Sequence, residues 1–133
     1  MSRYLLILVV FVFGCAEDRP ISSKGDPERG AMVFETCASC HALVHDANEP
    51  YFGPHLVGLF GRPVAADPNY DYSQAIESLG GEWTETRLAE YLKAPTVYAP
   101  GTTMVQALPD SQDVADVMAY MRQVIDASDG SAD

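Results

Sequence analysis

The sequence predicts a mostly α-helical domain, and three observations indicate this class. Residues that commonly cap helices, Asp26 and Thr84, precede two segments with helical character. Residues 45–69 show none of the alternation between polar and apolar side chains that marks a strand. Near the C-terminus, apolar residues recur at the spacing of one helix face: Val114, Val117, Met118, Met121, Val124 and Ile125. We therefore expect an all-α fold of about three main helices plus short ones.

The length and the net charge of the chain limit the kinds of function that it can have. The chain has 133 residues, which suits one domain with short tails. It carries 19 acidic and 8 basic residues, for a net charge of −11. Nucleic-acid binding is excluded as a function, because phosphates would be repelled. Solubility and electrostatic steering of a partner explain the acidity equally well.

Residues 1–14 are typical of a secretory signal peptide. Arg3 supplies the positive start, and residues 4–13 form an unbroken apolar run. In a helix this run covers about 15 Å, half of a hydrocarbon core of about 30 Å, so it is too short to span a membrane comfortably. We therefore expect the protein to be exported to the periplasm.

The apolar run ends at Gly14-Cys15, which resembles the lipidation site of a bacterial lipoprotein. Phe13 fits that pattern poorly, and cleavage after Ala16, which would discard Cys15, is the alternative. We favour lipidation of Cys15, because an odd exported thiol without a role is a liability. The protein would then be anchored to the membrane, with the polar residues 15–25 as a tether.

The folded domain is expected to occupy residues 26–127 and to begin with a helix. Asp26 is a suitable N-cap, and Pro27 suits the first helical position, where no backbone hydrogen bond is lost. Gly30 costs about 1 kcal/mol inside a helix, which suggests close contact with another helix. This helix leads directly into Cys37.

Short helices and irregular segments are expected to follow. Residues 45–69 are punctuated by glycine and proline, and a loop of this length normally has a functional reason. Residues 73–79 are compatible with a short helix. Thr84 caps a better one, which Pro95 is expected to end, and residues 95–109 are again irregular.

The last helix has the strongest amphipathic pattern in the chain. Asp110 and Ser111 are both suitable N-caps for it. The polar residues 128–133 are expected to form a tail beyond the domain.

A C-x-x-C-H run is formed by Cys37, Cys40 and His41, and this spacing is typical of covalent c-type haem attachment. The two thiols can reach the two vinyl groups of a porphyrin, and the adjacent imidazole is then held over the iron. A redox dithiol would need a βαβ setting, and a structural zinc site a second ligand pair. Neither is indicated, because Cys15 is the only other cysteine and the other histidines form no spaced pair.

The chain from about Asp26 to Ile125 resembles class I cytochrome c, in the electron-carrier branch of mitochondria and bacteria. The motifs that carry the resemblance occur in order: Cys37-x-x-Cys40-His41, Gly53-Pro54-His55-Leu56-Val57-Gly58-Leu59-Phe60-Gly61-Arg62, Trp83, Tyr91-Leu92 and Pro100-Gly101-Thr102-Thr103-Met104. The resemblance implies one haem, attached through Cys37 and Cys40. It also implies that the first and last helices cross near Gly30, Phe34 and Tyr120.

The resemblance further implies the iron ligands. His41 would be the proximal ligand, and its second ring nitrogen would donate to the carbonyl of Pro54. Met104 would be the distal ligand, with Tyr91 near its sulfur. Met104 could instead fill the core, but it follows a Pro-Gly-Thr-Thr loop without apolar periodicity. With the sixth position filled, the remaining histidines, such as His55, are expected to be solvent-facing or loop residues.

The inner haem propionate is implied to be held by a set of hydrogen-bond donors: Arg62, Tyr72 and Trp83, assisted by Ser73 and Thr102. A buried carboxylate is costly unless such donors surround it. The sequence departs from the mitochondrial pattern at Ile76, where a polar side chain is usual. It also lacks the lysines around the haem edge, where Thr36, Thr96, Val97 and Thr103 stand instead.

The function implied by the resemblance is that of an exported, monomeric electron carrier and not an enzyme. Its partners would be of the quinol:cytochrome c reductase, terminal oxidase or photosynthetic reaction-centre type. Two alternatives remain open. Dissociation of Met104 would create a peroxidase-like enzyme or a gas sensor, and the chain could also be the cytochrome subunit of a larger oxidoreductase.

Overall fold

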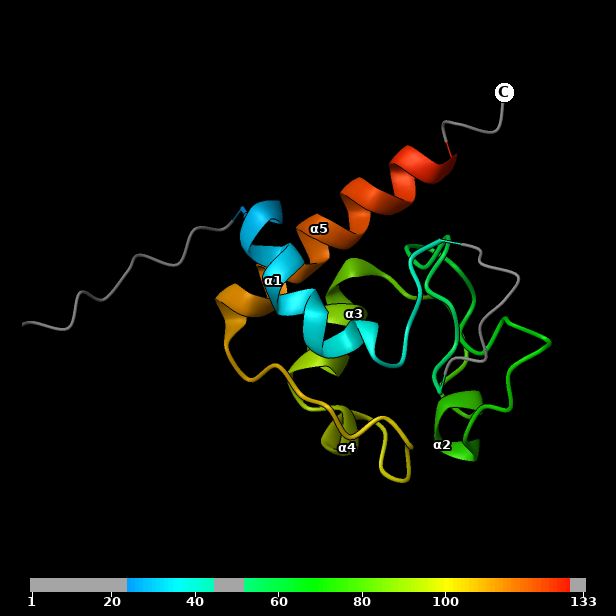
Figure 1. Ribbon diagram of the computed structural model, residues 1–133. Helices are drawn as coiled ribbons and strands as arrows, with labels where there is room; N and C mark the ends of the chain where they lie inside the picture. Colours follow the sequence, from blue (N-terminus) through cyan, green and yellow to red (C-terminus); the bar gives the residue numbers. More distant parts are fainter. Residues whose placement is uncertain (1–23, 45–51, 130–133) are drawn as a thin grey trace, which may run out of the picture.

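Five α-helices form the regular structure of the part of the chain that the computed structural model describes, residues 24–44 and 52–129 (Figure 1). They are α1 (Pro27–Ala38), α2 (Gln74–Glu77), α3 (Glu85–Lys93), α4 (Pro95–Tyr98) and α5 (Ser111–Asp129). Across these two ranges the only β-type pairing is a single antiparallel bridge between Pro63 and Glu82. The prediction of an all-α fold is confirmed.

Several expectations concern residues outside the described ranges. They are the signal peptide at residues 1–14, the lipidation site Cys15, most of the tether, and residues 130–133 of the tail. No helix within 24–44 and 52–129 combines the length and apolar character needed to cross a bilayer.

The predicted helix caps are present. The carboxylate of Asp26 accepts hydrogen bonds from the first-turn amides of Glu28 and Arg29. The hydroxyl of Thr84 accepts from a first-turn amide of α3 at 3.3 Å. At α5, Asp110 and not Ser111 caps the helix, because its carboxylate accepts two first-turn amides, the nearer at 2.7 Å. Local sequence chemistry therefore sets these helix starts.

The start of α4 differs from expectation, and two features at the ends of the domain add to the sequence analysis. Pro95 begins α4, although the sequence predicted an irregular segment there; proline is compatible with the first position of a helix as well as with a break. Helix α5 extends to Asp129. The end of the predicted tether packs against α5, since a Cβ added to Gly25 would lie 1.9 Å from the carbonyl oxygen of Ala115.

Helices α1 and α5 cross, and this contact organises the fold (Figure 1). A Cβ at Gly30 would lie 2.0 Å from the carbonyl oxygen of Asp116, so only glycine permits the approach. One turn further along α1, Phe34 packs against Tyr120 with ring centroids 5.6 Å apart. The crossing residues implied by the resemblance are therefore confirmed.

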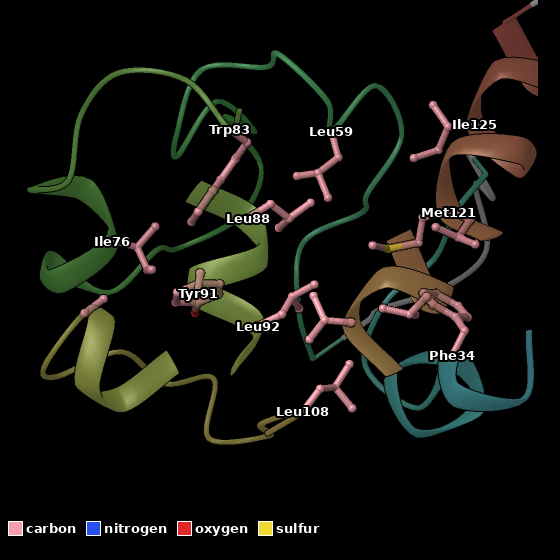
Figure 2. Packing of buried hydrophobic residues seen from close by; sticks show 14 residues of the cluster. Phe34, Leu59, Ile76, Trp83, Leu88, Tyr91, Leu92, Leu108, Met121 and Ile125 are labelled. Atoms are coloured by element: carbon pink, nitrogen blue, oxygen red, sulfur yellow. The ribbon is translucent and has the colours of Figure 1, made fainter. Parts of the chain in front are cut away.

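The buried core extends from this crossing to α2, α3 and the irregular segments around them. Figure 2 shows Phe34, Met121 and Ile125 at the crossing, with Ile76, Trp83 and Tyr91 at the other end of the cluster. Ile76, expected to replace a polar residue, is buried at 8% exposure. The aromatic end of the core thus lies among the segments that carry the predicted site residues.

Candidate haem-binding site

The C-x-x-C-H run lies where α1 ends. Cys37 is in the last turn of the helix, and its carbonyl oxygen accepts hydrogen bonds from the amides of both Cys40 (3.0 Å) and His41 (2.9 Å). This turn brings both free, half-buried thiols and the imidazole onto one short segment. Burial raises the pKa of the Cys37 thiol, and the hydrogen bond with the Thr36 hydroxyl offsets only part of this rise. A reactive dithiol requires the opposite, a lowered thiol pKa.

His41 is held in one orientation. Its Nδ1 donates to the carbonyl oxygen of Pro54 at 2.7 Å. Because a carbonyl can only accept, the proton resides on Nδ1, and Nε2 presents a lone pair suited to a metal. Burial lowers the pKa of His41, with the Pro54 bond opposing it, so the ring is neutral at neutral pH, as ligation requires.

Gly53 is part of this arrangement, and sequence reasoning missed its role. A Cβ at Gly53 would lie 2.4 Å from Cε1 of His41, so the ring rests directly on the glycine backbone. The amide of Gly53 also donates to the carbonyl oxygen of Cys40 at 2.9 Å, which ties the 53–54 segment to the C-x-x-C-H turn. The Gly53-Pro54 pair was the available signal, but it indicated only a turn.

The loop that carries Met104 is attached to α3. The buried hydroxyl of Thr102 bonds to the hydroxyl of Tyr91 at 2.9 Å and accepts the Met104 amide at 3.3 Å. Gly101 has φ +96°, a conformation that favours glycine. Met104 is half-buried against the core, so its thioether belongs to an ordered loop. Contact between Tyr91 and the Met104 sulfur stays a prediction.

Arg62 and Ser73 provide a test of whether these residues suit a haem. The guanidinium of Arg62 donates to the carbonyl oxygens of Val57 (2.8 Å) and His55 (3.0 Å), while its Nε is buried without a partner. The hydroxyl of Ser73 is also buried without a partner. Buried donors normally have a hydrogen-bond partner. The family resemblance implies that both residues hold a haem propionate, and an anionic carboxylate bound there would accept hydrogen bonds from these two donors.

Trp83 and Tyr72 complete the predicted propionate set. Trp83 is buried, packs against Tyr91 with ring centroids 5.2 Å apart, and donates its amide to the carbonyl oxygen of Arg62 at 2.9 Å. The hydroxyl of Tyr72 accepts the amide of Asp67 at 3.4 Å, and burial raises its pKa, so it remains a donor at neutral pH. Both residues are therefore tied to the segment that carries Arg62.

His55 lies in a loop, as expected, but it does not simply face solvent. Its Nε2 lies 3.3 Å from Oδ2 of Asp67, and its side chain is 29% exposed. The sequence offered no signal for this pair, because the two residues are neither helical neighbours nor part of one motif. By contrast, the four positions expected to lack lysines are exposed and uncharged: Thr36, Thr96, Val97 and Thr103.

The helices, the C-x-x-C-H turn and the unsatisfied donors together define a small helical protein built to hold one haem. The family model for cytochrome c matches residues 27–124. The chain belongs to the cytochrome c family. It is 40% identical over 101 residues to a cytochrome c of Gossypium barbadense, covering 74% of this chain and 90% of that protein.

Bacterial relatives extend the comparison. Cytochrome c2 of Agrobacterium tumefaciens is 35% identical over 102 residues, which are 74% of this chain and 91% of that protein. A cytochrome c homolog of Rickettsia bellii is 37% identical over 106 residues, 79% of this chain but only 61% of that longer protein. The protein is accordingly a mono-haem electron carrier rather than an enzyme, with a covalently attached c-type haem, and it exchanges electrons with redox partner proteins.

Proposed function

We propose that this electron carrier is exported and holds its haem through Cys37 and Cys40, with His41 and Met104 as the iron ligands. The observation that carries the proposal is the 2.7 Å bond from His41 Nδ1 to Pro54, next to two free thiols on the same turn. This bond places the ring proton on Nδ1, so the second ring nitrogen, Nε2, is unprotonated and able to bind a metal. The ordered Met104 loop supports the distal role.

Each residue of the site has a physical task in this proposal. When bound, the haem supplies one-electron exchange between ferric and ferrous iron. Pro54 and Gly53 keep the His41 ring in place, and the Tyr91–Thr102 bond keeps the Met104 loop in place. A thioether ligand favours the ferrous state, and fixed ligands limit the rearrangement between the two oxidation states.

The propionate donors have a separate task. They are Arg62, Tyr72, Ser73, Trp83 and Thr102. The unsatisfied Arg62 Nε and Ser73 hydroxyl support direct contact with a carboxylate. Thr102 supports the site mainly through the loop, since its hydroxyl is already engaged with Tyr91.

Substitution of Met104 tests the ligation. We expect Met104→Ala to remove the weak sulfur-to-iron absorption band of the ferric protein in the near-red region. The reduction potential should fall by roughly 0.1–0.3 V, which is a tenth to a third of the ~0.8 V range that different axial ligands span. Met32→Ala is the matched control, because Met32 is 63% exposed on α1. Absence of the band from the unmodified protein would contradict the proposal and favour an open, reactive iron. Retention of the band by Met104→Ala would contradict the proposal by showing that a different sulfur binds the iron.

The localisation proposed is the periplasm, with cleavage of the signal peptide at residues 1–14 and a lipid on Cys15. Residues 15–25 then act as a tether for the domain that begins at residue 26. The bacterial relatives support export. We expect Cys15→Ser to move the protein from the membrane fraction to the soluble periplasm. Unchanged membrane association of this variant would contradict the proposal of a lipid anchor. The mass of the mature protein shows both where the signal peptide is cleaved and whether a lipid is attached.

The partners proposed are a donor of the quinol:cytochrome c reductase type and an acceptor of the terminal oxidase or reaction-centre type. Thr96 and Val97 on α4 and Thr103, next to Met104 in the sequence, are exposed and uncharged, which supports a docking face that does not depend on a basic ring. We expect the purified protein to be monomeric by sedimentation. Co-purification with one oxidoreductase in fixed ratio would instead identify it as a subunit of that enzyme.

A further inference from the structure

A histidine–carboxylate pair lies beside Arg62 and has no role in the site described above. His55 Nε2 is 3.3 Å from Asp67 Oδ2, and the two side chains are 29% and 9% exposed. On the other side of the ring, Nδ1 of His55 lies 3.5 Å from NH1 of Arg62. The imidazole therefore connects a nearly buried carboxylate to the guanidinium that carries an unsatisfied Nε.

The chemistry of the neighbours sets the protonation pattern of the ring. A guanidinium can only donate, so Nδ1 of His55 must be the acceptor in the contact with Arg62. Nε2 then carries the proton and donates to Asp67. This neutral tautomer is the one in which both contacts are hydrogen bonds.

Addition of a proton changes the contact with Arg62. Protonated His55 carries hydrogen on both ring nitrogens, so Nδ1 can no longer accept from NH1, and two positive groups then face each other. The pair with Asp67 becomes a full ion pair. Arg62 keeps its bonds to the carbonyl oxygens of Val57 and His55, but the guanidinium loses its third partner.

We propose that His55, held by Asp67, is a positioning residue for Arg62, and that proton binding at His55 couples the reduction potential of the haem to pH. This inference rests on the proposed function, in which Arg62 contacts a haem propionate. Histidine is the side chain whose ordinary titration range spans neutral pH, so the coupling operates where the protein works.

The sign of the coupling follows from charge. Protonation of His55 adds one positive charge to the group that it forms with Asp67 and Arg62. Positive charge near the iron favours the ferrous state, so the potential falls as pH rises and His55 loses its proton. The electron comes from the redox partner and the proton from water. Tyr72, whose hydroxyl accepts the Asp67 amide, stays neutral across this range because burial raises its pKa.

The test is the reduction potential of the holoprotein measured by spectroelectrochemistry between pH 5 and 8. We expect the proton affinity of His55 to differ about threefold between ferrous and ferric protein. This corresponds to a fall of about 28 mV, at about 59 mV per tenfold change for one electron. In His55→Gln, which keeps an amide able to bond to both neighbours, the potential should be nearly independent of pH over this range.

Two further variants separate the pair from its surroundings. Asp67→Asn keeps the hydrogen-bonding shape but removes the charge that stabilises protonated His55, so the fall should move to lower pH. His45→Gln is the matched control, since it removes another histidine of the same chain. We expect His45→Gln to behave as the unmodified protein does.

A second readout does not depend on any variant. In the NMR spectrum, the ring proton of His55 should titrate at a higher pH in the ferrous than in the ferric protein. Equal titration in both states, an unchanged pH dependence in His55→Gln, or loss of the dependence only in His45→Gln would overturn the inference. The near-red band, recorded in the same samples, tests Met104 ligation independently and so distinguishes failure of the proposed function from failure of this inference.

Discussion

Single hydrogen bonds decide the chemistry of this site at the scale of the residue. The Pro54 carbonyl selects the tautomer of His41, and the Thr102 hydroxyl links Tyr91 to the backbone of Met104. A buried donor without a partner costs about 1–3 kcal/mol. Arg62 Nε and Ser73 Oγ are two such donors. A carboxylate that accepts hydrogen bonds from them removes this cost and so stabilises the protein.

Gly53→Ala tests how closely the backbone supports His41. The new Cβ would lie 2.4 Å from Cε1 and 2.8 Å from Nδ1 of the ring, so the ring must move and the bond to Pro54 is weakened. We expect a loss of about 1–3 kcal/mol in unfolding free energy, typical of overpacking. The near-red band should weaken as well, because His41, the proposed iron ligand, is displaced.

Gly80→Ala is the control for this substitution. Gly80 has φ +55° and no atom within 4 Å of an added Cβ, so the variant adds backbone strain without contacting His41. We expect it to lower stability by about 1 kcal/mol and to leave the spectrum unchanged. Equal spectra for both glycine variants would show that Gly53 does not position the ring.

The α1–α5 crossing is the main contact between elements, and a buried carboxylate lies within it. Asp116 is fully buried on α5 and accepts from the Asp26 amide, Gln112 and Arg29, each at 2.7 Å. Burial alone would raise the pKa of Asp116, but these donors outweigh it and hold the pKa below its ordinary value. The cap residue of α1 is thereby connected to the middle of α5.

Asp116 predicts how stability depends on pH. Because its pKa is lower in the folded than in the unfolded protein, its contribution is present above the unfolded value of about 3.9. The contribution is lost as pH falls through the folded value. We expect Asp116→Asn to lower the unfolding free energy at pH 7 by about 2 kcal/mol and to reduce the loss of stability below about pH 4. Urea denaturation between pH 2.5 and 7 measures both effects.

Asp126→Asn provides the comparison on the same helix. Asp126 is exposed, so its replacement should change stability by less than about 0.5 kcal/mol. A pH profile of Asp116→Asn that matches those of Asp126→Asn and the unmodified protein would refute the role assigned to the buried carboxylate.

Charge acts at the scale of the whole molecule. The chain has a net charge of −11, yet the side chains expected around the haem edge are uncharged. Long-range attraction therefore comes from the total charge and not from a local ring. Such attraction is screened by salt, because the Debye length falls from about 10 Å at 0.1 M to about 3 Å at 1 M.

Electron transfer to small inorganic probes tests this steering. With a cationic probe such as hexaammineruthenium(III), we expect the rate to fall by about tenfold as salt rises from 0.01 M to 1 M. With anionic ferricyanide the rate should rise over the same range. Stopped-flow absorbance measures both reactions, and a flat response to salt with both probes would remove steering as an explanation of the acidity.

The sequence by itself determined where the three longest helices begin and the kind of cofactor. Caps such as Asp26 and Thr84 and the apolar spacing of α5 act between near neighbours, so they can be recognised without a structure. The C-x-x-C-H run identifies haem attachment through spacing alone. Family resemblance added the roles implied for Met104 and the propionate donors.

Only the tertiary structure decided which distant groups meet. Gly53 lies under His41, Thr102 bonds to Tyr91, and Asp67 pairs with His55, although none of these pairs shares a helix face or a motif. Periodicity reports on a residue's own element, whereas these contacts depend on how loops and helices pack. For the same reason Pro95 could be recognised as a boundary but not as the start of α4, because proline suits both positions.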